Sequence, residues 1–325
     1  MSEHQSRIAI AVPYFGKLPN YFQLWLISCK YNPSIDWYVF TNDQTEFQYP
    51  DNVHVTYESF EDMRKRFQSS FDFKIAINVP YKLCDFRPSY GEVFVQIFKN
   101  YDFWGFCDLD IIFGNIRNFL TEEILDKHDK ILTLGHFTLY RNSGKINQMY
   151  REHIGAELAF RKVFSAAKYL GFDERGPFTI EAIFKNKEVR VYNEIVFADV
   201  KIEKYNFELT HSKLDKIERQ RKCTVFAFQQ GRLVRYFLED NRIGEREYLY
   251  VHLQKRPMKL ELSITKQDKF LIIPNKFIDY NDIINIKTIR LLGKHKGIML
   301  RNVWIVFKEN GKSILRGWIK FLFHV

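Results

Sequence analysis

The sequence contains few cysteines, no long apolar run and no apparent leader segment. Its four cysteines show no Cys-x-x-Cys spacing, and three of them lie in apolar contexts. This pattern predicts buried free thiols in a reducing compartment. No apolar stretch reaches the roughly 18 residues that a membrane span requires, and the polar start, Met1–Arg7, does not resemble a secretory signal. We therefore expect a cytoplasmic protein.

Internal repeats and low-complexity linkers are also absent. The chain has 325 residues, of which 46% are apolar and 27% are charged, so it can bury a substantial core and is expected to be globular. Aromatic residues make up 17% of the chain, with 31 Phe and 18 Tyr. This share indicates crowded cores and stacking surfaces.

The positive charge is concentrated at one end of the chain. The formal net charge is +10, and residues 286–325 contain nine Lys or Arg and one acid. Residues 1–285 are close to neutral, which argues against a protein that binds nucleic acid over its whole surface. We expect no nucleic-acid partner.

Strand and helix patterns alternate at the start of the chain. A β-branched run at residues 7–12 is followed by a helical pattern with a buried stripe, and then by strand patterns at 35–40 and 53–57. The stripe consists of Phe22, Trp25, Leu26 and Cys29. This order predicts an α/β fold whose sheet is mixed but mostly parallel and is flanked by helices.

Weaker patterns continue to about residue 257. Helices are expected at residues 88–100, 121–127, 157–170 and 177–187, and strands at 130–134, 138–141, 224–229, 233–238 and 247–253. Residues 1–257 are interpreted as one catalytic domain, and residues 258–325 as a small basic extension.

Asp108 and Asp110 follow directly after the apolar segment Tyr101–Cys107. Alternate residues of an extended segment point to the same side, so the two carboxylates can converge just past a buried strand. Hard divalent ions prefer such oxygen ligands, and the crevice beyond the carboxyl ends of strands is where open α/β sheets bind ligands. A solvated turn is the alternative interpretation of this motif.

A second candidate metal ligand occurs late in the chain. In Tyr248–Leu253 the alternation places His252 at the end of a strand, where it can bind Mn²⁺ or Mg²⁺ together with carboxylates. Lys255 and Arg256 follow, and cations there can neutralise phosphate charge. The alternative is an ordinary histidine whose hydrogen bonds are satisfied at the strand end.

These motifs together resemble the pattern of GT-A fold glycosyltransferases. Those enzymes use an Asp-x-Asp and a late His-Lys-Pro element to hold a divalent ion on the diphosphate of a nucleotide sugar. Here His252 and Lys255 are one residue closer than in the glycogenin-like pattern, and Arg256 precedes Pro257. Several segments also resemble a group of bacterial capsule and O-antigen polysaccharide-biosynthesis proteins, and the resemblance covers residues 7–257. The segments are Ile8–Gly16, Phe40–Asp43, Lys82–Pro88 and Gly105–Ile116.

The resemblance implies a metal-dependent hexosyltransferase that uses Mn²⁺ or Mg²⁺ and a nucleoside-diphosphate sugar such as a UDP-sugar. It implies that Asp108, Asp110 and His252 hold the metal. It also implies a donor site that includes Pro13, Tyr14, Lys82, Asp85, Arg87, Asp108 and Lys255. Tyr14 would stack on the base and Asp85 would bind a hydroxyl group. The alternatives are a turn aromatic at Tyr14 and a solvated helix start around Lys82–Arg87.

Catalysis would need the metal as a Lewis acid on the departing diphosphate. An inverting enzyme would also need a carboxylate base, for which Asp173 and Glu174 are the candidates. Both can equally be acids near a helix N-terminus. His136 is a weaker candidate for a contact with the acceptor, and an ordinary turn histidine is its alternative.

The expected acceptor is a glycan or a polyprenyl-linked saccharide. The basic and apolar residues 316–325 can lie on an anionic membrane at the inner face of the cell membrane, or they can form a packed appendage. Two other functions remain open. One is a non-catalytic nucleotide- or glycan-binding module, and the other is a haloacid-dehalogenase-like phosphatase, although Asp-x-Asp normally closes the first strand in those enzymes.

Overall fold

A computed structural model describes residues 5–153, 159–174, 179–211, 213–214, 216–221, 223–262, 268–280 and 284–293. The chain forms two compact units. The first comprises Met1–Ile111 and Asn115–Glu194, and the second comprises Ile112–Gly114 and Ile195–Val325. Within the described residues, no helix has the length and apolar character needed to cross a membrane.

The first unit is built on a seven-stranded sheet with the order β3-β2-β1-β4-β7-β6-β8. Its strands are β1 (Ile8–Pro13), β2 (Ile35–Thr41), β3 (Val53–Tyr57), β4 (Phe103–Cys107), β6 (Lys130–Leu134), β7 (Phe137–Arg141) and β8 (Val191–Tyr192). Pairs β1–β2, β2–β3, β1–β4 and β6–β8 are parallel, whereas β4–β7 and β6–β7 are antiparallel. The predicted mixed, mostly parallel α/β sheet is therefore confirmed.

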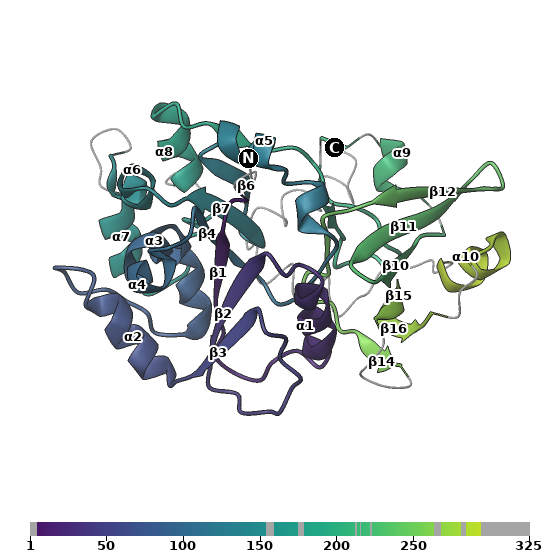
Figure 1. Ribbon diagram of the computed structural model, residues 1–325, viewed down its shortest axis with the longest axis horizontal. Coiled ribbons are helices and arrows are strands. Elements are labelled where there is room, and N and C mark those ends of the chain that lie inside the picture. Colours follow the sequence, from purple (N-terminus) through teal and green to yellow (C-terminus); the bar gives the residue numbers. More distant parts are fainter. Residues whose placement is uncertain are drawn as a thin grey trace, which may run out of the picture. The chain divides into compact units, whose positions relative to one another are not determined.

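Helices cover both faces of this sheet (Figure 1). On one face, α1 (Phe22–Lys30) buries the predicted stripe, and its Trp25 contacts Trp37 of β2 with ring centroids 6.3 Å apart. The other helices of the unit lie between residues 60 and 186. They are α2 (Phe60–Gln68), the 3-10 helices η1 (Pro80–Ser89), η2 (Ile116–Asn118) and η3 (Met149–Arg151), α3 (Tyr90–Val93), α4 (Val95–Phe98), α5 (Glu122–Lys127), α6 (Gly144–Asn147), α7 (Ala159–Ser165) and α8 (Ile180–Asn186).

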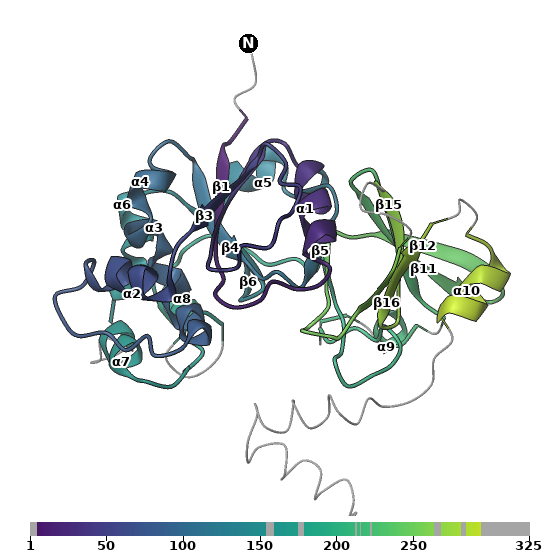
Figure 2. The ribbon, with the colours of Figure 1, turned by 90° about the horizontal axis from the view of Figure 1, so that it is seen from below.

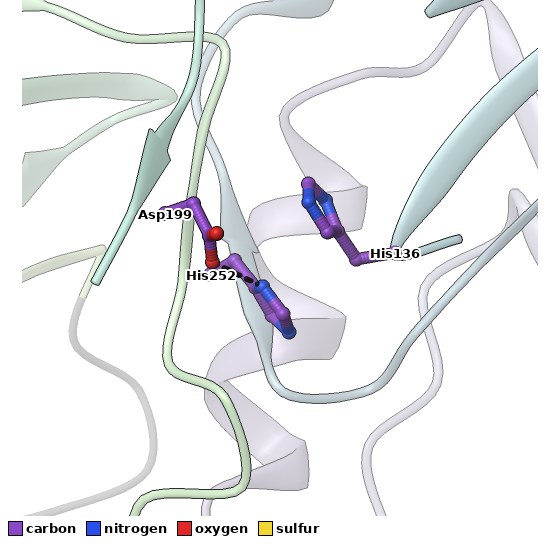
Figure 3. Close-up of side chains that lie close together, drawn as sticks. All are labelled: His136, Asp199 and His252. Carbon is purple, nitrogen blue, oxygen red and sulfur yellow. Dashed lines mark hydrogen bonds and ion pairs between the residues drawn. The ribbon is translucent and has the colours of Figure 1, made fainter. Parts of the chain in front are cut away.

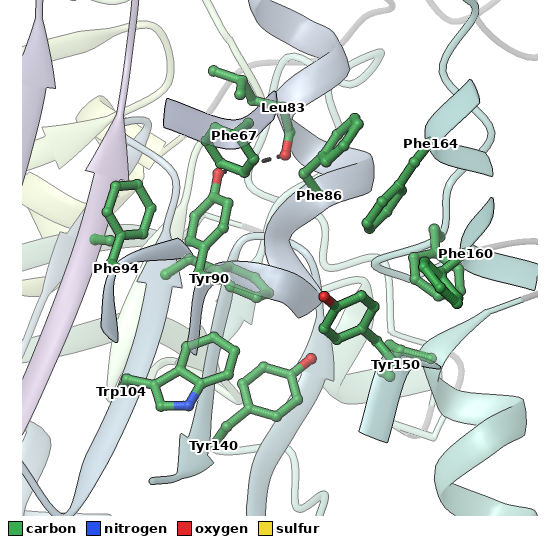
Figure 4. Packing of buried hydrophobic residues seen from close by; sticks show 14 of the residues in the cluster. Phe67, Leu83, Phe86, Tyr90, Phe94, Trp104, Tyr140, Tyr150, Phe160 and Phe164 are labelled. Carbon is green, nitrogen blue, oxygen red and sulfur yellow. Dashed lines mark hydrogen bonds between the residues drawn. The ribbon is translucent and has the colours of Figure 1, made fainter. Parts of the chain in front are cut away.

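An aromatic core fills the space between the sheet and the helices on its second face (Figure 4). Trp104 of β4 stacks on Tyr140 of β7 at 4.5 Å, and Phe86 of η1 stacks on Phe164 of α7 at 4.0 Å. Because β4 alternates, Trp104 and Phe106 both face this core. The high aromatic content predicted such a crowded core.

The second unit contains two sheets, and several strands of the larger one are labelled in Figure 2. One has the order β12-β11-β10-β15-β16-β14, and a three-stranded sheet has the order β5-β13-β9. The elements are β5 (Ile111–Phe113), β9 (Ala198–Asp199), α9 (Lys216–Arg219), β10 (Val225–Gln229), β11 (Arg232–Glu239), β12 (Arg242–Glu247), β13 (Tyr250–His252), β14 (Lys259–Glu261), β15 (Lys269–Ile273), β16 (Lys276–Asp279) and α10 (Ile286–Gly293). Ile289 of α10 is fully buried in the core of the unit.

Two expectations about elements differ from the structure. The helix expected at 88–100 is divided into the end of η1, α3 and α4, and the break between α3 and α4 falls at Phe94, whose φ of −106° and ψ of 25° lie outside the α-helical region. Residues 258–325 are expected to form a small extension, whereas residues 259–261, 269–273 and 276–279 of this range add three strands to the sheet of β10–β12. The assignment of residues 1–257 to a catalytic domain stays a prediction. All four cysteines are free thiols, but only Cys29 and Cys107 are buried as predicted, whereas Cys84 and Cys223 are half-buried.

Candidate active site

Asp108 and Asp110 lie at the carboxyl end of β4. Strand β4 runs parallel to β1, with Ala11 opposite Phe106, so both strands end at the same edge of the sheet. Carboxylate oxygens of the two aspartates lie within 4.8 Å of each other, and Asp110 is buried. Two carboxylates this close repel each other unless a cation lies near them, and a hard divalent ion fits such a donor pair.

Arg87 of η1 joins Asp108 to a second acidic group. Its Nη2 donates to Asp108 Oδ1, and its Nη1 donates to Asp173 Oδ2 at 3.0 Å and to the Gly135 carbonyl at 2.7 Å. The guanidinium also lies over the Phe106 ring, 5.0 Å from its centroid. Phe106 lies in β4 and Asp108 follows two residues later, so both side chains point to the same side of the extended chain, toward Arg87 of η1.

The two predicted base candidates lie on the other side of Arg87. Asp173 is buried, and Tyr169 donates to its Oδ1 at 3.0 Å. Burial raises the pKa of Asp173 to about 7, although the Arg87 guanidinium opposes the rise and Glu174 adds to it. Glu174 is half-buried and accepts a hydrogen bond from the Gly135 amide at 2.9 Å. A carboxyl with this pKa can exchange a proton near neutral pH.

The end of β1 lies beside the aspartate pair. Pro13 and Tyr14 are half-buried there, and the Tyr14 amide donates to the Phe40 carbonyl at 2.8 Å. Burial raises the pKa of the Tyr14 phenol, and the negative charges of Asp110 and Asp108 raise it further. The phenol therefore stays neutral and lies within the electric field of both carboxylates.

The loop after β1 is held by side chains that follow β2. Gly16 has a positive φ of 116°, which favours glycine, and its amide donates to Asn42 Oδ1 at 2.8 Å. Asp43 Oδ2 accepts from the Leu18 amide at 2.8 Å. Residues Asn42 and Asp43, part of one of the segments that carry the family resemblance, thus shape the edge where ligands bind in open α/β sheets.

Lys82 and Asp85 form a fully buried ion pair inside η1. Their charged atoms are 2.6 Å apart, and both side chains have no exposed surface. Lys82 also donates to the carbonyls of Val163 and Lys168 at 2.9 Å, while Asp85 accepts from the amides of Leu170 and Phe172 at 2.9 Å. The pair ties η1 to the segment that precedes Asp173. A contact of either residue with the donor stays a prediction.

His252 is the last residue of β13 in the second unit, and Asp199 is its neighbour on β9 (Figure 3). Nδ1 of His252 lies 2.7 Å from Oδ1 of Asp199. His136, also drawn in Figure 3, belongs to the first unit, where it is buried and its carbonyl accepts the Asp108 amide at 3.0 Å. Its predicted contact with an acceptor stays a prediction.

The two basic residues that follow His252 differ in their exposure to solvent. Lys255 is exposed and follows Gln254 in a tight turn in which both residues have positive φ values, 55° and 50°. Arg256 is buried and donates to the carbonyls of Lys201 and Tyr205. Burial lowers the pKa of Arg256 to about 10. Lys255 can thus approach a phosphate, whereas Arg256 holds the second unit together.

A family model described as "Family of unknown function (DUF6625)" matches residues 10–281. The chain belongs to this family. The match extends beyond residue 257 into β16, so the strands after Pro257 are part of the family's common region. No curated protein matches the chain.

Among solved structures, several glycosyltransferases are similar to this DUF6625 protein. An active-site mutant of LgtC is 11% identical with a TM-score of 0.32, covering 60% of this chain and 74% of that one. The galactosyltransferase LgtC with donor and acceptor sugar analogues is 11% identical with a TM-score of 0.30, covering 60% and 75%. The apo-form glycosyltransferase GlyE of Streptococcus pneumoniae is 14% identical with a TM-score of 0.26, covering 58% and 46%.

The sequence interpretation of this family member missed Asp199, which contacts His252, and the two polar residues that hold Asp199. Asp199 contacts the imidazole directly, and Thr210 and Gln254 donate to Asp199. One signal was present, because Asp199 follows the apolar run Ile195–Ala198 just as Asp108 follows β4. That signal does not identify the partner strand, which lies more than 50 residues later.

Proposed function

We propose that the protein is a metal-dependent glycosyltransferase that moves a sugar from a nucleoside-diphosphate sugar to a saccharide acceptor. The observation that supports this most is the carboxylate pair Asp108 and Asp110, within 4.8 Å at the carboxyl end of β4. It lies beside the end of the parallel strand β1, where open α/β sheets bind nucleotides. The resemblance to GT-A glycosyltransferases supports the same function.

In this proposal Asp108, Asp110 and His252 hold Mn²⁺ or Mg²⁺. Asp110 directly precedes β5, and within the three-stranded sheet β5 neighbours β13, which ends at His252. The bound ion would supply Lewis-acid stabilisation of the leaving diphosphate. Tyr14 would stack on the base of a UDP-sugar, and Lys255 would contribute positive charge near the phosphates.

Asp173 is our choice for the base that accepts the acceptor's hydroxyl proton if the reaction inverts the anomeric centre. Its pKa of about 7 allows it to accept a proton near neutral pH. Arg87 would hold Asp173 and Asp108 at fixed positions, so the base and the donor site keep their spacing. Glu174 is the second candidate, and its contact with the Gly135 amide places it on the same loop.

The proposed acceptor is a glycan or a polyprenyl-linked saccharide of bacterial surface polysaccharide synthesis. Residues 294–325, which carry most of the basic tail, lie outside the described residues. Their seven Lys or Arg and one acid support a peripheral contact with an anionic membrane. This contact would bring the enzyme to lipid-linked acceptors at the inner face of the cell membrane.

A donor screen tests the proposal. The purified chain is incubated with single nucleotide sugars and Mn²⁺ without acceptor, and release of nucleoside diphosphate is measured. We expect slow hydrolysis of one donor, loss of this activity in EDTA, and loss in Asp110→Ala. Asp129→Asn is the matched control, since Asp129 is a half-buried carboxylate of the same unit that pairs with Arg190 at 2.8 Å.

The screen also separates the competing functions. Hydrolysis of no donor, together with tight nucleotide binding, would favour a non-catalytic binding module. A haloacid-dehalogenase-like phosphatase would instead release inorganic phosphate from phosphomonoesters. In the structure the Asp-x-Asp follows the fourth strand in chain order, whereas that class normally carries it after the first strand.

A further inference from the structure

His252 and Asp199 are held side by side by two parallel strands of the second unit. Strands β9 and β13 pair the two residues in register, and the Val200 amide donates to the His252 carbonyl at 3.1 Å. The 2.7 Å contact joins Nδ1 of the imidazole to a carboxylate oxygen. Because a carboxylate accepts hydrogen bonds, Nδ1 carries the proton, and Nε2 is the ring nitrogen that can bind a metal ion.

Asp199 is itself fixed by neighbouring side chains. Its Oδ1 also accepts from Gln254 Nε2 at 2.7 Å, and its Oδ2 accepts from the Thr210 hydroxyl. The Thr210 amide donates to the Asp199 carbonyl at 2.8 Å, and the carboxylate is buried. Contacts on both oxygens restrict rotation of the carboxylate, so it can hold the imidazole ring in one orientation.

We propose that Asp199 is a positioning residue that fixes the tautomer and ring orientation of His252, so that Nε2 is presented as a ligand to the divalent ion. This inference rests on the proposed function, in which His252 binds the metal. Residues that orient metal-binding histidines in this way typically change metal affinity 10- to 100-fold when they are replaced. Nothing in the sequence motifs had assigned a role to Asp199.

Mn²⁺ binding to the otherwise unliganded protein is the first test. Free Mn²⁺ is counted by electron paramagnetic resonance during titration of wild type, Asp199→Asn and Asp199→Ala. The asparagine variant keeps the shape of the side chain and removes its charge. We expect Mn²⁺ affinity to fall by about 10- to 100-fold in both variants, with unchanged circular dichroism.

Glu208→Gln is the matched control. Glu208 is as buried as Asp199, at 8% exposed, and it also belongs to the second unit, but its carboxylate pairs with Lys201 and not with His252. We expect this variant to bind Mn²⁺ like wild type. A loss of affinity in Glu208→Gln equal to that in Asp199→Asn would mean that general loosening of the second unit, and not orientation of His252, sets metal affinity.

The tautomer of His252 and a double-mutant cycle test whether Asp199 changes Mn²⁺ affinity through His252. Nitrogen-15 spectra of the metal-free protein should show neutral His252 protonated at Nδ1 in wild type, and a mixture of tautomers in Asp199→Ala. In a His252→Ala background, Asp199→Asn should change Mn²⁺ affinity by less than about twofold, because the residue through which it acts is gone.

The outcomes separate the inference from the function on which it depends. Absence of Mn²⁺ binding in wild type would overturn both. Binding in wild type that is unchanged in the Asp199 variants would overturn only the role of Asp199. Wild-type His252 protonated at Nε2 would also overturn that role, since the proton would then occupy the nitrogen that must bind the metal.

Discussion

Arg87 is the residue on which the electrostatics of the first unit depend. One guanidinium contacts Asp108, a proposed metal ligand, and Asp173, the proposed base. Removing one partner of a buried charge pair leaves the other charge uncompensated, which typically destabilises a protein by several kcal/mol. The same arginine therefore stabilises the fold and links the two halves of the candidate site.

Asp173 should make the stability of the first unit depend on pH. Its carboxyl ionises at its ordinary pKa of 3.8 when the chain is unfolded, and at about 7 when it is folded. The folded state therefore holds the proton more tightly. The stabilisation from protonated Asp173 is fully present below about pH 4 and is lost as pH rises through about 7.

Urea unfolding near pH 6 and near pH 8 measures this effect. Between these values wild type should lose about 1 kcal/mol more stability than Asp173→Asn, which cannot ionise. The exposed Asp72→Asn is the control and should follow wild type. Equal pH dependence of wild type and Asp173→Asn would contradict the assignment of a raised pKa to Asp173.

At the scale of elements, β4 determines where the aspartate pair lies. The apolar residues of β4 predicted a buried strand that ends just before Asp108 and Asp110, and the structure contains this strand. The sequence did not predict that β4 also pairs with β7, because β7 lies about 30 residues later in the chain and runs antiparallel to β4. Local patterns define strands, whereas pairing depends on packing between distant residues.

Gly105 allows β7 to pack closely against β4. A Cβ atom at this position would overlap the Thr138 carbonyl and lie 2.6 Å from Leu139 Cδ2. Since backbone cannot move aside without breaking the ladder, Gly105→Ala should lower the free energy of unfolding by about 2 kcal/mol or more.

Gly144→Ala is the matched comparison, because nothing lies within 4 Å of its added methyl group. It should change the free energy of unfolding by less than about 0.5 kcal/mol. Thermal or urea unfolding of both variants measures the difference. A Gly105→Ala protein as stable as Gly144→Ala would show that β4 and β7 are less closely packed than the structure indicates.

The candidate site was predictable where its residues follow strands and was not predictable where they meet through space. The sequence motifs indicated Asp108, Asp110, His252 and Asp173, but they did not indicate that Arg87 joins Asp108 to Asp173. They also did not indicate that Asp85, the candidate for binding a hydroxyl group, forms a buried pair with Lys82. Motif spacing predicts which side chains are candidates for a site, whereas their burial and their partners depend on the whole fold.

At the scale of the whole molecule, the chain divides into a unit with the sheet of β1–β4 and a unit that carries His252. The basic tail was expected to begin near residue 286. The structure shows that α10 packs in the core of the second unit, with Ile289 fully buried. A test of the tail should therefore remove residues 294–325 and leave α10 in place.

Removing residues 294–325 should weaken sedimentation with anionic liposomes and leave nucleotide binding unchanged. Seven Lys or Arg are lost, and each basic residue near an anionic surface contributes about 1 kcal/mol. Neutral liposomes are the control and should bind neither protein. Equal binding of the full and shortened chains to anionic liposomes would reject the membrane role.

Metal-dependent binding of a nucleoside diphosphate tests the account most directly. In isothermal titration calorimetry, wild type should bind UDP in Mn²⁺ and bind it far more weakly in EDTA, because the ion links the diphosphate to the carboxylates. Asp110→Ala should abolish the Mn²⁺-dependent binding, and Asp129→Asn should retain it. UDP binding of equal strength with and without metal, or retained in Asp110→Ala, would contradict the proposed mechanism.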